Sequence, residues 1–170
     1  MITDCLSSPV VIVGCGNTLY ADDGFGPAVI EYLLQYYSLP SGATALDAGT
    51  ALGQLLFDLA LSPKKPQLLI IVDAVYLEHK TPGQVFELEL EHIPPNKQAN
   101  FGLHQFPSVN LLQELKTKAS VQIRIAAVQI RHLPTRLQPG LSPEAEVQQA
   151  VPQACNLLLS WCSQTVPAAK

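Results

Sequence analysis

Short apolar runs alternate with amphipathic segments along nearly the whole chain, and this alternation restricts the fold more than any other feature. Five runs have the length and apolar content of strands: residues 9–13, 43–47, 67–72, 84–90 and 121–130. Four segments have helical periodicity or helix-start signals: residues 25–37, 51–61, about 104–118 and about 143–162. Alternation of this kind predicts an α/β protein whose parallel sheet carries helices on both faces.

The strand at 84–90 breaks the parallel pattern. Its connection from the strand at 67–72 contains a Thr81-Pro82-Gly83 turn and is too short for a helical crossover. We therefore expect this strand to run antiparallel, at an edge of the sheet. The 170 residues are 48% hydrophobic and contain no internal repeat, so we expect residues 1–170 to form one domain with a substantial hydrophobic core.

Composition excludes several classes of function. The net charge is −4 and no basic run is present, which argues against a nucleic-acid partner. The longest apolar stretch, LLIIVDAV, is too short to span a bilayer, and the N-terminus lacks the basic region of a signal peptide. None of the four cysteines forms a C-x-x-C pair. These features predict a cytoplasmic protein with reduced thiols and no membrane partner.

Acidic side chains stand where three of the predicted strands end. Asp22 and Asp23 come after the first strand, Asp47 ends the second, Asp73 follows the third, and His104 lies near the start of the third helix. Ligands of open α/β sheets bind beyond the carboxyl ends of the strands, where the strand order reverses. Carboxylates with an imidazole suit a divalent metal of intermediate softness.

Each of these residues also has a purely structural interpretation. Asp22 or Asp23 can cap the following helix, and Asp47 can form an Asx turn before Gly49. His104 can be a loop histidine whose hydrogen bonds are satisfied. Cys15 can be a nucleophile, but a small buried side chain is the more usual role. Asp73 fits a structural role least well, because a carboxylate after five apolar residues is costly without a partner.

The sequence GCGNTLYADDGFG, residues 14–26, invites comparison with a dinucleotide-binding loop. The G-x-G-x-x-G fingerprint would need glycine where Leu19 stands. The loop also places two negative charges beside the expected pyrophosphate, and unit charges about 4 Å apart repel by roughly 4 kcal/mol at an intermediate dielectric. Nucleotide binding is therefore disfavoured relative to metal binding. The chain has neither the G-x-S-x-G elbow of serine hydrolases nor the H-E-x-x-H motif of zincins.

Several motifs together resemble the hydrogenase maturation proteases, the endopeptidases that trim the large subunit of nickel–iron hydrogenases. They are GCGNTLYADDGFGPAV, LDAGT, IIVDAV followed by PGQV, a lone histidine opening the third helix, and GLSPE. The resemblance covers about residues 9–160. It implies a three-layer α/β/α sandwich with a five-stranded mixed sheet of order 2-1-3-5-4, in which strand 4 is antiparallel.

The resemblance also implies a site and a substrate. Asp23, Asp73 and His104 would bind nickel carried by the precursor of a hydrogenase large subunit, whose C-terminal extension is removed. Asp47 is a further acidic position of the same site, so the candidate catalytic residues are Asp23, Asp47, Asp73 and His104. The family often has glutamate at the position of Asp23. No permanently bound cofactor is expected.

The chemistry of cleavage stays open at this point. Coordinated nickel can polarise the scissile carbonyl or activate a water, or a carboxylate such as Asp23 or Asp47 can act as general base. A non-enzymatic metal- or nucleotide-binding module of the same fold is the alternative function. A peptidase without specificity for one precursor is a third.

Overall fold

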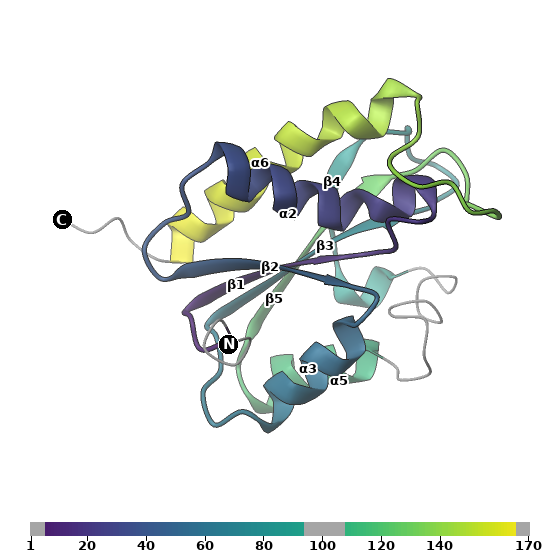
Figure 1. The fold of residues 1–170 in the computed structure, drawn as a ribbon. Helices are drawn as coiled ribbons and strands as arrows, with labels where there is room; N and C mark the ends of the chain where they lie inside the picture. Colours follow the sequence, from purple (N-terminus) through teal and green to yellow (C-terminus); the bar gives the residue numbers. More distant parts are fainter. Residues whose placement is uncertain (1–5, 94–107, 166–170) are drawn as a thin grey trace.

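The computed structural model describes residues 6–93 and 108–165. Its elements follow the predicted order of strands and helices (Figure 1). They are β1 (Val10–Cys15), η1 (Ala21–Gly24), α2 (Phe25–Tyr36), β2 (Ala43–Gly49), α3 (Leu52–Leu61), β3 (Leu68–Val75), β4 (Val85–Leu88), η2 (Leu90–His92), α5 (Ser108–Lys118), β5 (Gln122–Gln129) and α6 (Ala145–Thr165).

The five strands form one mixed sheet of order β2-β1-β3-β5-β4. β1 pairs in parallel with β2 and β3, and β3 pairs in parallel with β5. β4 runs antiparallel to β5 at the edge. The predicted strand order and the antiparallel edge strand are both confirmed.

Two helix layers cover the sheet, α2 with α6 on one face and α3 with α5 on the other (Figure 1). Each layer has its own apolar cluster. Val10 and Ile12 of β1 belong to the cluster under α2 and α6, whereas Val11 and Val13 belong to the cluster under α3 and α5. This alternation is the period of two that a strand imposes. All residues of β3 are buried, because helices cover both of its faces.

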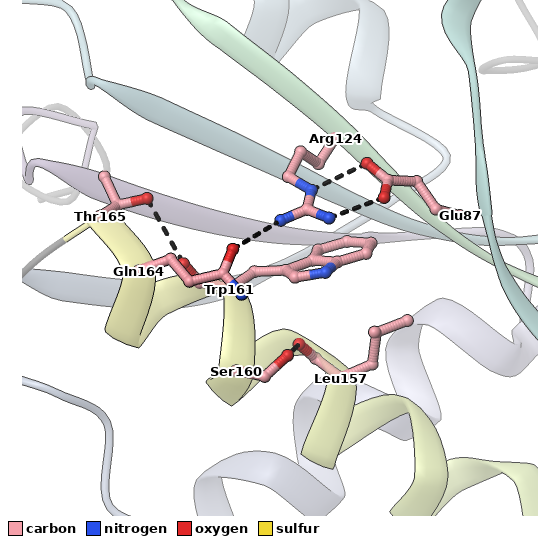
Figure 2. A network of polar contacts seen from close by, with 7 residues as sticks. All are labelled: Glu87, Arg124, Leu157, Ser160, Trp161, Gln164 and Thr165. Atoms are coloured by element: carbon pink, nitrogen blue, oxygen red, sulfur yellow. Dashed lines mark hydrogen bonds and ion pairs between the residues drawn. The ribbon is translucent and has the colours of Figure 1, made fainter.

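A polar clamp fixes the edge strand β4 to its neighbours (Figure 2). Arg124 of β5 donates two hydrogen bonds to the Glu87 carboxylate of β4, at 2.8 and 2.6 Å. The same guanidinium lies over the Trp161 ring of α6, 3.8 Å from the ring centroid. The clamp therefore joins β4, β5 and α6 through one cation.

Several element boundaries differ from the predicted ones, and three of the differences bear on the site. β3 continues to Val75 because its pairing with β5 continues, so Asp73 lies inside the strand rather than after it. β2 likewise continues past Asp47 to Gly49. α6 begins at Ala145, later than predicted, and Ser142, which lies before the helix, donates its backbone N–H to Asp22.

Candidate active site

The ends of β1, β2 and β3 lie side by side because β1 pairs with both neighbours in parallel. Gly14 of β1 is the register partner of Asp47 in β2 and of Val72 in β3. Asp73 follows Val72 directly, so two acidic residues flank the end of β1. β2 and β3 extend the sheet in opposite directions from β1, and this reversal is where open α/β sheets bind ligands.

Asp23 lies in η1, just after the turn that follows β1. The turn requires glycine at position 16, where φ is +135° and a Cβ would lie 1.8 Å from the carbonyl oxygen of Asp23. The Oδ2 atom of Asp23 accepts a hydrogen bond from the Asn17 backbone N–H at 2.9 Å. Asp23 is half-buried, and η1 contacts β3. The turn thus brings the element that carries Asp23 against the strand that carries Asp73.

Asp73 is 2% exposed. Its neighbours along one face of β3, Ile71 and Val75, belong to the cluster under α3 and α5, so strand alternation turns Asp73 toward that layer. The Oδ1 atom accepts a hydrogen bond from the Ala74 backbone N–H at 2.8 Å. Burying a carboxylate is costly for folding unless it is paired, and this hydrogen bond offsets part of that cost.

Asp47 faces the other helix layer. Ala43 and Ala45 pack with the cluster under α2 and α6, whereas Leu46 packs with the opposite cluster, so alternation turns Asp47 toward α2. Its Oδ1 atom accepts a hydrogen bond from the Gly49 backbone N–H at 2.7 Å. The Asx-turn interpretation is therefore confirmed. The side chain is exposed, so the hydrogen bond leaves it accessible to a ligand.

A groove of about 430 Å³ opens beside Asp47. We call it the α2 groove, and it is lined by Thr18, Gly24, Pro27, Ala28, Ile30, Glu31, Leu34, Asp47, Gly140 and Leu141. Sequence reasoning did not predict it. The only signal available was Leu34, which belongs to the apolar stripe of the helix but is 55% exposed in the structure.

One wall of the groove is built by two distant segments that pair through their backbones. Gln138 donates to the Leu19 carbonyl at 2.8 Å, and Gly140 donates to the Thr18 carbonyl at 3.0 Å. Ala21 in turn donates to the Gln138 carbonyl at 2.6 Å. The segment before α6 is thereby fixed against the loop that follows β1.

Asp22 also joins the segment before α6 to the loop after β1, and we call this contact the junction. Asp22 is 8% exposed, and its Oδ1 atom accepts a hydrogen bond from the backbone N–H of Ser142 at 2.8 Å. Neither η1 nor α2 has a side-chain hydrogen bond at its N-cap. The capping interpretation is therefore wrong for both Asp22 and Asp23, because the turn after β1 commits each carboxylate to a backbone N–H elsewhere.

Gly26 serves packing within the protein. A Cβ at this position would lie 2.2 Å from the carbonyl oxygen of Cys15 and 2.5 Å from that of Val72. The first turn of α2 therefore sits directly on the ends of β1 and β3. This close contact explains the glycine without any approach of a substrate backbone.

The described cysteines are core side chains. Cys15 is 4% exposed, and its thiol donates to the Val72 carbonyl at 3.3 Å. Cys155 and Cys162 lie within α6 and are fully buried, and burial raises the pKa of each thiol to about 11. The interpretation of Cys15 as a small buried side chain is confirmed by its burial. The raised pKa of Cys155 and Cys162 makes these two thiols poor nucleophiles.

His104 lies outside the described residues. Among residues 6–93 and 108–165, no group of three or more histidine, cysteine, aspartate or glutamate side chains is arranged to hold a metal ion. The structure thus brings the elements of Asp23 and Asp73 together and places Asp47 across the sheet. The metal-binding roles of Asp23, Asp73 and His104 all stay predictions.

The fold and the acidic strand ends define the class of the protein. It is a three-layer α/β/α sandwich with acidic residues where the strand order reverses. Residues 27–161 match the family model described as hydrogenase maturation protease. A putative hydrogenase maturation protease from Methanocaldococcus jannaschii is 31% identical, over 88% of this chain and 94% of that protein. Hydrogenase 2 maturation protease from Escherichia coli is 30% identical, over 93% and 95% of the two chains.

Solved structures agree with these relatives. The hydrogenase maturating endopeptidase HybD from Escherichia coli is 27% identical with a TM-score of 0.64, over 91% of this chain and 92% of that chain. The chain belongs to the hydrogenase maturation protease family, and it is an endopeptidase of hydrogenase maturation. The family match contains Asp47, Asp73 and His104 and begins just after Asp23.

Within the described part of the chain, no helix has the length and apolar character that a membrane span needs.

Proposed function

We propose that this endopeptidase removes the C-terminal extension of a hydrogenase large-subunit precursor that already carries nickel. The nickel belongs to the substrate in this proposal. The observation that carries it is the contact between η1 and β3 at the strand-order reversal. That contact brings a half-buried acid, Asp23, to the end of the sheet where the buried acid Asp73 lies.

In the proposal Asp23, Asp73 and His104 complete the coordination of the nickel. Carboxylates and imidazole suit a divalent metal of intermediate softness. Asp73 is 2% exposed, and a carboxylate in low-dielectric surroundings attracts a divalent cation more strongly than one in water. A precursor without nickel would therefore bind more weakly, which makes the metal a checkpoint before cleavage.

The nickel or a carboxylate would then activate the reaction. Coordinated nickel polarises the scissile carbonyl or lowers the pKa of a bound water, and a neighbouring carboxylate can act as general base. Of the two candidate bases, Asp23 lies in the element that contacts β3. Asp47 faces the α2 layer. We therefore assign it a contact with the substrate peptide on that side of the sheet.

We further propose that residues 1–170 act as one domain in the cytoplasm. Cys155 and Cys162 are free and buried in the described structure. Reduced thiols of this kind are typical of cytoplasmic proteins.

Cleavage assays with nickel-loaded and nickel-free precursor test the proposal. The wild type is expected to cleave only the loaded form, while Asp23→Ala and His104→Ala are expected to lose most of that activity. His92→Ala is the matched control, because the His92 side chain is 72% exposed and lies in η2. Equal cleavage of the nickel-loaded and nickel-free precursor by the wild type and all variants would contradict the proposal.

A further inference from the structure

The α2 groove combines apolar walls with charge of a single sign. Pro27, Ile30 and Leu34 of α2 form one side, and Leu141 contributes from the segment before α6. Among the described residues, the charged side chains that line the groove are Glu31 and Asp47, with neither lysine nor arginine.

The two carboxylates are available to a ligand. Glu31 and Asp47 are exposed, and the ion pairs among the described residues join other side chains. Like charges beside an apolar surface focus a field that attracts an opposite charge. A positive side chain entering the groove would therefore meet two acids with no competing cation in its lining.

The apolar part of the groove is open to solvent as well. Leu34 is 55% exposed although it lies within a helix whose other leucine, Leu33, is fully buried. Leu19 and Leu137 are 51% and 67% exposed, and they belong to the segments whose pairing builds the groove wall. Exposed apolar side chains grouped around a concavity are typical of binding surfaces.

The groove also adjoins the Asp47 side of the candidate active site. Gly24, which follows Asp23 directly, and Asp47 are among its lining residues. Its volume of about 430 Å³ lies near the lower end of the usual range of ligand pockets, about 300–1,000 Å³. It therefore suits a few side chains of an extended peptide.

We propose that the α2 groove is a peptide subsite for a precursor segment in which a lysine or arginine adjoins apolar side chains. The positive group pairs with Glu31 and Asp47, while its apolar neighbours pack on Leu34 and Leu141. This inference rests on the proposed function, since the segment belongs to the precursor that the protease cleaves.

Steady-state cleavage of nickel-loaded precursor tests the subsite. Glu31→Gln is expected to raise KM about 3- to 10-fold with kcat within about twofold, because a partly exposed charge pair contributes to binding and not to the bond-breaking step. Leu34→Ala should act in the same way through lost apolar contact. Glu114→Gln is the matched control and should change neither constant, because Glu114 lies in α5 on the opposite layer.

Failure of the subsite and failure of the proposed function give different results. If the wild type cleaves the precursor while Glu31→Gln and Leu34→Ala keep the wild-type KM, the subsite is wrong. If the wild type does not cleave at all, the proposed function is wrong, and the subsite is then judged by peptide binding alone.

Two synthetic probes provide that measurement: the blocked peptide Ala-Val-Arg-Val-Ala and the same peptide with neutral citrulline in place of arginine. Backbone-amide NMR titration of the wild type should show shifts at Gly24, Glu31 and Gly140 with the arginine peptide. The citrulline peptide should bind at least about threefold more weakly, and high salt should narrow the difference.

Equal affinity for the two peptides, shifts confined to other surfaces, or no shift at millimolar peptide would overturn the subsite. Concentration-dependent shifts of the same amides without peptide would identify a second copy of the chain as the occupant and would also overturn it.

Discussion

Asp47 and Asp73 flank the carboxyl end of β1, where the parallel strands end, but they face opposite helix layers. Asp47 faces α2, whereas Asp73 faces the layer of α3 and α5. Residues that look equivalent along the sequence therefore meet a substrate from different sides. Their contributions to cleavage should be separable.

Double substitutions should reveal this separation. We expect the effects of Asp47→Asn and Asp73→Asn on kcat/KM to add within about 0.5 kcal/mol, because the two side chains face opposite helix layers. Asp23→Asn and Asp73→Asn should couple by more than about 1 kcal/mol, because both are proposed to hold one metal. Steady-state kinetics of the three single and two double variants measures both couplings. Strong coupling of Asp47 with Asp73 would contradict the assignment.

Asp22 should matter for stability. Asp22→Ala leaves the buried backbone N–H of Ser142 without its carboxylate acceptor, and we expect a loss of about 1–3 kcal/mol in the free energy of unfolding. Asp58→Ala is the control, because the Asp58 side chain is exposed and accepts a hydrogen bond from Gln54, one turn earlier within α3. Urea unfolding measures both; similar midpoints for the two variants would show that the junction is not stabilising.

Gly26→Ala should destabilise the protein although alanine favours helix. Its Cβ would fall 2.2 Å from the Cys15 carbonyl oxygen, so α2 must shift from the sheet at a cost of about 1–3 kcal/mol or more. Gln35→Ala, at an exposed position of α2, should change stability by no more than about 0.5 kcal/mol. Thermal unfolding compares the two, and equal midpoints would argue against the close contact.

The polar clamp on β4 should contribute more to the free energy of unfolding than a surface ion pair does. We expect Arg124→Ala to cost about 1–3 kcal/mol, since it removes a bidentate charged pair and a cation–π contact, with the Arg124 side chain 18% exposed (Figure 2). Arg131→Ala breaks a pair with Glu146 whose side chains are 53% and 36% exposed, and it should cost less than about 1 kcal/mol. Chemical unfolding tests this ranking, and the reverse order would refute it.

The two buried thiols of α6 should make the free energy of unfolding fall at alkaline pH. Because burial raises the pKa of Cys155 and Cys162 from 9.0 to about 11, the folded state keeps protons that the unfolded chain releases. Their contribution is fully present below pH 9 and is lost as pH rises toward 11. The Cys155→Ala/Cys162→Ala variant should be less stable at pH 8 but decline less steeply above pH 9. Parallel declines in urea midpoints would rule out this contribution.

The fold could be predicted from the sequence because the signals for its strands and helices are local. Apolar runs such as 67–72 and the helical stripe of 25–37 report burial through their period. The short connection through Thr81-Pro82-Gly83 correctly required an antiparallel edge strand. Boundaries were less certain, since the end of β3 depends on how far β5 remains its partner.

The surroundings of the acids were harder to predict. Asp22 and Asp23 are adjacent and chemically identical, and both are acceptable helix caps by sequence. Their actual partners are the N–H groups of Ser142 and Asn17. The first of these lies 120 positions away along the chain, so no local pattern indicates it.

The sequence alone determined which chemical groups stand at the edge of the sheet, because strand periodicity and glycine turns place Asp23, Asp47 and Asp73 near strand ends. Only the tertiary structure decided which way they face and what lies beside them. The α2 groove exists because the segment from Gln138 to Ser142 pairs with the loop after β1. Such long-range pairing depends on the packed sheet and helices, and local sequence periodicity carries no record of it.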